Sequence, residues 1–320
     1  MSFFNHLKVD YIPGIQENWS GRSSTLKNQY WHQIIQVNHI ENLNLNNTTE
    51  IGLIGYACDA GVKRNQGNIG AKKGPESVRN RLGKLPIHCT KKITDFGELV
   101  CVDDYLEDCQ EALSKIISKL ITNKVIPIAI GGGHDIAYAN FNGIKDALKN
   151  SCKNNIGIVN FDAHFDLRPL ETKPNSGTPF YQILKENSNV SYFAIGIQQQ
   201  SNTKELFDIA KKYNVSYVSN FNCDIFSELL KKQLHDFINT IDYLYITIDL
   251  DGFSSAYAPG VSAPSPLGFS PNFVYKIVEF LFESKKVISC DIAELNPEFD
   301  HANTTANLAA RLVDFIVLNT

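Results

Sequence analysis

The 320-residue sequence has no run of about 20 apolar residues, the length a helix needs to cross a bilayer, so no membrane span is expected. It has no excess of basic residues either. Its 34 acidic residues against 30 Lys and Arg give a net charge of −4, whereas a nucleic-acid-binding domain normally carries a basic face. The N-terminal stretch MSFFNHLKVDYIPG lacks the basic segment and apolar core of a secretion signal. Neither a membrane nor a nucleic acid is therefore an expected partner.

Paired cysteines are also missing. The number of cysteines is odd, seven, and none forms a C-x-x-C motif. A disulfide framework in a secreted protein normally uses an even number of cysteines. We therefore expect reduced thiols and a cytoplasmic protein. The cysteines are Cys58, Cys89, Cys101, Cys109, Cys152, Cys223 and Cys290.

Short apolar runs rich in β-branched residues alternate with segments of helical periodicity. Such runs are typical of strands buried on both faces of a parallel sheet. The alternation predicts the α/β class, with a mainly parallel central sheet flanked by helices. Ser270-Pro271 supplies an N-cap and a first-turn residue for one of the helices. The expected strands are 51–57, 125–130, 156–161, 190–197, 243–250 and 286–292, and the expected helices are 109–123, 206–213, 228–241 and 272–282.

The N-terminal part of the chain differs from the rest. Residues 1–48 lack clear strand–helix alternation and end in the polar run ENLNLNNTTE. No internal repeat or low-complexity linker divides the remaining chain. We expect residues 1–48 to form an extension packed on a single domain of residues 49–320.

Polar residues follow four of the expected strands at their carboxyl ends. These segments are GGGHD (131–135), DAHFD (162–166), DLD (249–251) and DIAE (291–294). Each alone is equally consistent with a turn or a helix cap. In open α/β sheets, however, ligands bind beyond the carboxyl ends of the strands, and neighbouring parallel strands bring these ends to one edge. Together the four segments predict one functional site.

The charges of this site call for cations. Four carboxylates close together cannot all stay ionised without counter-charge, and two divalent ions would balance them. Oxygen and imidazole ligands without a thiolate suit Mn²⁺ or a similar metal. Two such ions about 3.5–4 Å apart would activate a bridging water. The candidate ligands are Asp162, Asp166, Asp249, Asp251, His134 and His164.

The spacing of Asp162 and Asp166 adds a geometric condition. Four residues of fully extended strand cover about 13 Å, too far for both carboxylates to bind one ion. We therefore expect the chain to leave the strand at about Asp162 and to curl.

In this order, GGGHD, DAHFD, TIDLD and DIAELNP resemble the ureohydrolase superfamily of arginases, agmatinases and formimidoylglutamases. Agmatinases usually read APGTGTP where this chain has APGVSAP. The resemblance implies a three-layer arginase-like fold and a homo-oligomer, either a trimer or a hexamer. The segments closest to formimidoylglutamases are WSGR (19–22), GYACDAGVKRNQGNIGAKKGPESVR (55–79), DLRP (166–169), SGTPF (176–180) and APGVSAP (258–264).

The resemblance also implies the role of each ligand, with two Mn²⁺ ions per chain. Asp166 would additionally accept a hydrogen bond from the attacking hydroxide, and Glu294 would pair with the amidine-like group of the substrate. Arginases place a His after DAHxD as a proton shuttle, but residues 167–187 contain none. This argues against arginase, and we hypothesise that Asp166 returns the proton instead. One ion would be held by His134, Asp162, Asp166 and Asp249, and the other by His164, Asp162, Asp249 and Asp251.

Arg168 is the best local indication of the substrate. It stands where arginases present an Asn to the substrate carboxylate, and a guanidinium suits bidentate carboxylate binding. It would repel agmatine, a dication. Arg64 and Ser176 are further candidates for substrate binding. For both arginines a structural ion pair is the alternative interpretation.

An acidic amidine is therefore the expected small-molecule substrate. By resemblance, the reaction is hydrolysis of N-formimidoyl-L-glutamate to L-glutamate and formamide, a step of histidine degradation. Three alternatives stay open: an agmatinase-like or arginase-like hydrolase of another guanidino acid, a one-metal deacetylase-like enzyme, and a non-catalytic protein that kept the fold. The complete ligand set together with Glu294 favours an enzyme.

Overall fold

The computed structural model describes residues 3–4 and 6–320. Its strands are β1 (Val9–Ile12), β2 (Gln36–Val37), β3 (Ile51–Ala57), β4 (Ile93–Cys101), β5 (Ile126–Ile130), β6 (Ile156–Phe161), β7 (Val190–Ile197), β8 (Ser216–Ser219), β9 (Tyr243–Asp249) and β10 (Val287–Ala293). Its α-helices are α1 (Trp31–Ile34), α2 (Ala60–Arg64), α3 (Gly74–Leu82), α4 (Leu106–Thr122), α5 (Ile136–Leu148), α6 (Pro179–Glu186), α7 (Lys204–Lys212), α8 (Glu228–Asn239), α9 (Pro271–Glu283) and α10 (Thr304–Asn319).

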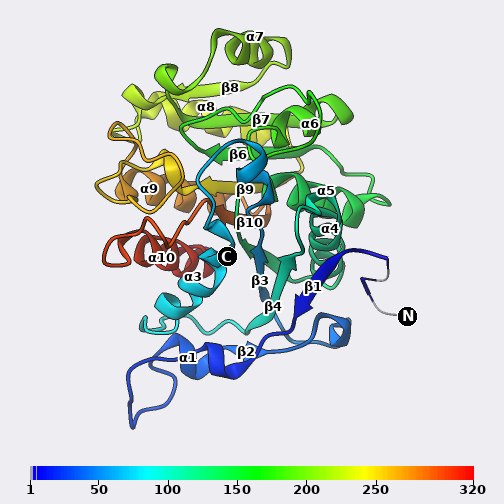
Figure 1. The fold of residues 1–320 in the computed structure, drawn as a ribbon, viewed down its shortest axis with the longest axis vertical. Helices are drawn as coiled ribbons and strands as arrows, with labels where there is room; N and C mark the ends of the chain where they lie inside the picture. Colours follow the sequence, from blue (N-terminus) through cyan, green and yellow to red (C-terminus); the bar gives the residue numbers. More distant parts are fainter. Residues whose placement is uncertain (1–2, 5) are drawn as a thin grey trace.

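Within the described residues the strands form one sheet in the order β1-β4-β3-β5-β10-β9-β6-β7-β8, and β2 pairs with β4 beside this path. β1 runs antiparallel to β4, and the other pairs are parallel. Helices lie on both faces of the sheet (Figure 1). The structure therefore confirms the predicted α/β class, the three layers and the mainly parallel sheet.

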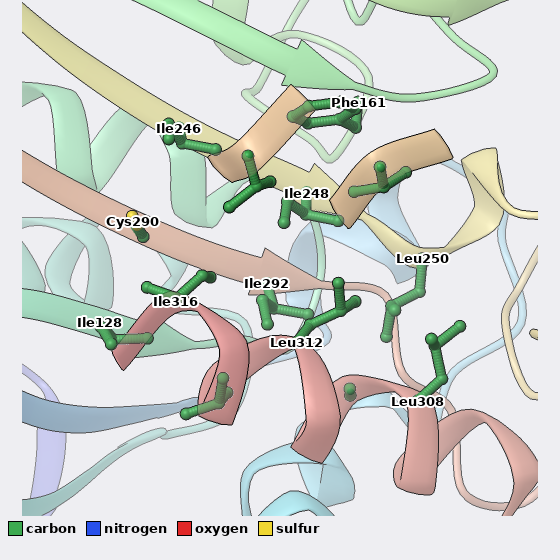
Figure 2. Packing of buried hydrophobic residues seen from close by; sticks show 14 of the residues in the cluster. Ile128, Phe161, Ile246, Ile248, Leu250, Cys290, Ile292, Leu308, Leu312 and Ile316 are labelled. Carbon is green, nitrogen blue, oxygen red and sulfur yellow. The ribbon is translucent and has the colours of Figure 1, made fainter. Parts of the chain in front are cut away.

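Two hydrophobic cores lie on opposite faces of the sheet. Side chains of α4, α5, α6 and α7 belong to one core, and those of α3, α8, α9 and α10 belong to the other. Figure 2 shows part of the second core, in which Leu312 and Ile316 of α10 lie against Ile292 of β10 and Ile128 of β5. Burial on both faces explains why the central strands are nearly continuous apolar runs. It also holds their carboxyl ends in fixed relative positions.

The strands and helices expected from the sequence are present. Each of the six expected strands matches an observed strand to within one residue at either end. Ser270 accepts a hydrogen bond from the backbone N–H of Phe273 and Pro271 is the first residue of α9, as the N-cap pattern predicted. β4 was not expected, because Asp95, Gly97 and Glu98 interrupt its apolar pattern.

The N-terminal segment adds to the edge of the sheet through β1. Trp19 is buried, and its indole N–H donates to Asp95 of β4 at 2.9 Å. The buried Arg79 guanidinium of α3 binds the same carboxylate, also at 2.9 Å. Trp31 is likewise buried and donates to Asp314 of α10. These contacts attach residues 6–48 to the rest of the chain. In the described part of the chain, no helix has the length and apolar character needed to cross a membrane.

Candidate active site

The site lies where four central strands end side by side. β5, β10, β9 and β6 are consecutive neighbours in the sheet. Because all four are parallel, the residues that follow them meet at one edge. This arrangement brings together the six predicted ligands and Glu294, as we expected from the sequence.

The first group of ligands surrounds the imidazole of His134, which follows β5. Its Nδ1 atom lies 2.8 Å from Asp166 Oδ2, 3.1 Å from Asp162 Oδ2 and 3.1 Å from Asp249 Oδ2. Three carboxylate oxygens therefore converge with one ring nitrogen. The donors are oxygen and nitrogen only, in the combination that suits Mn²⁺.

The DAHFD segment curls as predicted. β6 ends at Phe161, and Asp166 adopts a left-handed backbone with φ of +49°. Aspartate tolerates this conformation better than most residues. The turn brings the Asp162 and Asp166 carboxylates to the same nitrogen of His134, which an extended strand could not do.

A second group forms around His164. Its Nδ1 atom lies 3.2 Å from Asp251 Oδ2 and 3.4 Å from Asp162 Oδ1. Asp162 thus faces one histidine with each of its two oxygens and links the two groups. Asp249 belongs to the first group only, and its Oδ1 accepts the backbone N–H of Asp251 at 2.8 Å. That Asp249 also serves the second ion stays a prediction.

The electrostatics of the site reflect carboxylates crowded into a buried space. Burial alone would lower the pKa of His134, but the charge of Asp249 and hydrogen bonds to the surrounding carboxylates raise it well above its usual value. Burial raises the pKa of Asp249, and the charges of Asp251 and Asp162 raise it further. The Oδ1 atom of Asp251 is buried and has no hydrogen-bond partner among the described residues. Cations would replace these protons and satisfy the unpaired oxygen.

Thr247 and Asp291 orient His134. Nε2 of His134 lies 2.9 Å from Thr247 Oγ1, and the Thr247 hydroxyl donates to Asp291 Oδ1 at 2.6 Å. Since the hydroxyl proton goes to Asp291, Thr247 accepts the Nε2–H of His134. Nδ1 is then the nitrogen with a free lone pair, the form that a metal requires. We did not predict either role, although Thr247 precedes Asp249 by two positions and so shares its face of β9.

Glu294 directly follows β10 and lines the same cavity. Its Oε1 accepts the backbone N–H of His134 at 2.8 Å. Burial and the nearby charge of Asp251 raise its pKa to about 8. Its φ of +69° is unusual for Glu and changes the direction of the backbone where β10 ends. A carboxylate in this position can bind a cationic group that enters the cavity.

The cavity beside the ligands has a volume of about 300 Å³ and a polar wall. Arg168 lies on this wall, exposed, and donates to Asn65 Oδ1 at 3.0 Å. Asn65 in turn donates to Ser176 Oγ at 3.0 Å. No carboxylate of the described chain is ion-paired with Arg168, which leaves its charge available to a ligand. Asn65, the residue that links the two predicted substrate-binding residues, was not anticipated.

Arg64 requires a correction. Its guanidinium binds Asp104 at 3.1 Å and Glu107 at 2.8 Å, and it also donates to the Pro174 carbonyl. The side chain is 9% exposed and does not line the cavity. Arg64 therefore has the structural ion pair that was the alternative interpretation, because two carboxylates near α4 already occupy its donors.

Comparison with known proteins agrees with this geometry. The model of the arginase family matches residues 49–318. A formimidoylglutamase from Clostridium tetani is 41% identical, covering 98% of this chain and 97% of that protein. The structure of Trypanosoma cruzi formiminoglutamase with Mn²⁺ is similar at a TM-score of 0.74 and 26% identity, covering 85% of this chain and 93% of that one. Formimidoylglutamase from Bacillus subtilis shares the fold at a TM-score of 0.81 over 94% of both chains, at 20% identity. The chain belongs to the arginase family.

Proposed function

We propose that this protein is a binuclear manganese hydrolase that cleaves N-formimidoyl-L-glutamate to L-glutamate and formamide, as a step of histidine degradation. The observation that carries the proposal is the position of Arg168. Its unpaired guanidinium shares one cavity with the two ligand groups and with Glu294. Relatives named formimidoylglutamase, about 40% identical over nearly the whole chain, support the same activity.

The donor set fits two Mn²⁺ ions. The unpartnered, buried Oδ1 of Asp251 and the carboxylates that converge on His134 are the features that call for cations. His134, Asp162, Asp166 and Asp249 would hold one ion, and Asp162, His164 and Asp251 the other, with Asp249 as the expected second bridging ligand. When bound, the ions would lower the pKa of a water molecule and polarise the amidine.

Asp166 is placed to handle the proton. Its Oδ2 lies at the edge of the first ligand group, and its side chain is 12% exposed, whereas that of Asp162 is fully buried. Asp166 also lines the cavity. It would take the proton of the attacking water and return it to the glutamate nitrogen as the C–N bond breaks. This role replaces the histidine shuttle that residues 167–187 lack.

The two ends of the substrate have opposite charges, and so do the two sides of the cavity. The Glu294 carboxylate would pair with the cationic formimidoyl group near the ligands. Arg168, positioned by Asn65 and Ser176, would bind a substrate carboxylate. Holding both ends fixes the formimidoyl carbon beside the nucleophile, which lowers the entropic part of the barrier.

Product analysis tests the proposal. The Mn²⁺-loaded chain should release glutamate and formamide in equal amounts from N-formimidoyl-L-glutamate, and the metal-stripped chain should release neither. Asp166→Asn should lower kcat by about 100-fold or more, and a variant that kept both ions and full turnover would rule out this role of Asp166. Urea released from guanidino acids in preference would indicate another ureohydrolase. A chain with both ions bound that hydrolyses no amidine or guanidine would indicate a binding protein.

A further inference from the structure

Three cysteines lie together at the carboxyl ends of β3 and β4. Cys58 directly follows β3, Cys101 is the last residue of β4, and Cys109 lies in the first turns of α4. Their sulfur atoms are all within 4.8 Å of one another. None of the three lines the cavity of the candidate active site. This thiol cluster is therefore separate from the manganese ligands and has no part in the proposed reaction.

The strand pairing places Cys58 beside Cys101. β3 and β4 are parallel neighbours whose last paired residues are Ala57 and Val100, and Cys58 and Cys101 each follow directly on this pair. Neighbouring strands are about 4.8 Å apart. This spacing lies within the range of about 4.4–6.8 Å between Cα atoms that a disulfide requires. The two thiols can therefore be linked without a large movement of the backbone.

The three thiols differ in access and in charge. Cys58 and Cys109 are fully buried, whereas Cys101 is partly exposed. Hydrogen bonds from Cys109 and Cys58, helped by the charge of Arg64, outweigh burial and the charge of Asp135 and lower the pKa of Cys101 to about 4. The bond to Cys101 raises the pKa of Cys58 to about 12. The partly exposed cysteine is thus the one whose thiol has the lowered pKa, as in reactive cysteines.

Charge also indicates what this cluster does. Three thiolates around a divalent ion would leave a net charge of −1 beside the buried Asp135. Arg64 is already paired with Asp104 and Glu107, so this charge would have no ion-pair partner of its own. A disulfide is neutral and suits a buried position. The charges around these three cysteines therefore favour disulfide formation over metal binding.

We propose that Cys101 is a site of reversible oxidation by hydroperoxides, at which it forms a disulfide with Cys58. The Cys101 thiolate attacks one peroxide oxygen, the O–O bond breaks, and a sulfenic acid forms with release of hydroxide or alkoxide, which takes a proton from solvent to become water or alcohol. The Cys58 sulfur then attacks the Cys101 sulfur. The S–S bond forms, the S–O bond breaks, and the Cys58 proton leaves with the oxygen as water. Two thiols lose two electrons and the peroxide gains them.

Peptide mapping of the full-length reduced chain, treated with hydrogen peroxide and then blocked, tests this proposal. Cleavage after Lys and Glu separates the cysteines, because Cys58 lies in 51–63, Cys101 in 99–107 and Cys109 in 108–111. We expect 51–63 linked to 99–107, and release of the link by dithiothreitol. Cys101→Ser should abolish the link. Cys89→Ser, which changes another partly exposed cysteine outside the cluster, should leave it intact.

Alkylation of the unmodified chain provides a second test that needs no variant. The rate at Cys101 should be nearly constant between about pH 6 and 8, because its thiolate is already formed. The rate at a small free thiol such as N-acetylcysteine should rise about tenfold per pH unit over this range, because its pKa of about 8.5 lies above it. A rate at Cys101 that rises in parallel with that of the free thiol would overturn the proposal. So would a peroxide product in which Cys101 is linked to Cys109 only or carries only sulfinic acid.

Discussion

Nε2 of His134 lies 2.9 Å from Oγ1 of Thr247, and this contact decides which imidazole nitrogen faces the carboxylates. The Thr247 hydroxyl donates its hydrogen bond to Asp291 and therefore accepts one from the Nε2–H of His134. A histidine fixed in this way presents Nδ1 in the form that a metal can bind. The ligand geometry therefore depends on a threonine that is not itself one of the ligands.

Thr247→Val should weaken Mn²⁺ binding, because valine keeps the shape of the side chain but cannot accept the Nε2 proton. We expect the affinity to fall by about 10–100-fold, the range usual for lost outer-sphere partners of metal ligands. Chelator competition would measure it. Thr94→Val is the matched control, since Thr94 is also buried but bonds to Thr49 in another part of the sheet. An equal loss of affinity in both variants would contradict the orienting role.

Asp162 and Asp251 should differ in the number of ions that they control. Asp162 faces both histidines, whereas Asp251 faces only His164. Elemental analysis should therefore find about one Mn²⁺ per chain in Asp251→Asn and less than one in Asp162→Asn, against two in the unmodified chain. Equal stoichiometry in the two variants would show that Asp162 does not link the sites.

Manganese binding should tighten as pH rises. Burial alone would lower the pKa of His164, but the charge of Asp251 and hydrogen bonds to Asp162 and Asp251 raise it well above its usual value. The pKa of His134 is raised in the same way by its surrounding carboxylates. The metal-free histidines therefore hold protons at neutral pH that an incoming ion must displace. The association constant should rise about tenfold per pH unit for each proton displaced, until pH exceeds these raised pKa values. Titrations in buffers of different ionisation enthalpy would count the protons, and an affinity independent of pH would contradict this account.

Arg168→Gln should raise KM for an acidic substrate, because it removes the unpaired charge at the cavity wall. The loss of a charged hydrogen bond corresponds to about 1.5–3 kcal/mol in kcat/KM. Arg64→Gln is the contrasting variant. Arg64 pairs with Asp104 and Glu107 away from the cavity, so this change should lower Tm and leave KM nearly unchanged. A larger rise in KM for Arg64→Gln than for Arg168→Gln would reverse these two assignments.

The parts of the structure that could be predicted follow directly from local patterns. β3, β6 and β7 begin and end where their apolar runs do, because strands buried on both faces exclude polar residues. The curl after β6 followed from a distance that an extended chain cannot close. In both cases the residues of one short segment are enough to explain its conformation.

The remaining features depend on partners distant in sequence. β4 contains Asp95, whose burial makes sense only beside Arg79 and Trp19. Arg64 resembled a substrate ligand until the fold brought Asp104 and Glu107 to it. No local pattern in the sequence shows which arginine the fold will pair internally and which it will leave open to a ligand.

The most direct test of the central claim is a comparison of kcat/KM for four substrates with the Mn²⁺-loaded chain. The substrates are N-formimidoyl-L-glutamate, L-arginine, agmatine and 4-guanidinobutyrate. We predict that N-formimidoyl-L-glutamate exceeds the others by about 100-fold or more, since it alone of the four carries two carboxylates for the side of Arg168 together with a cationic end for Glu294. Agmatine turned over as well as N-formimidoyl-L-glutamate would contradict the account, because a dication should be repelled where Arg168 stands.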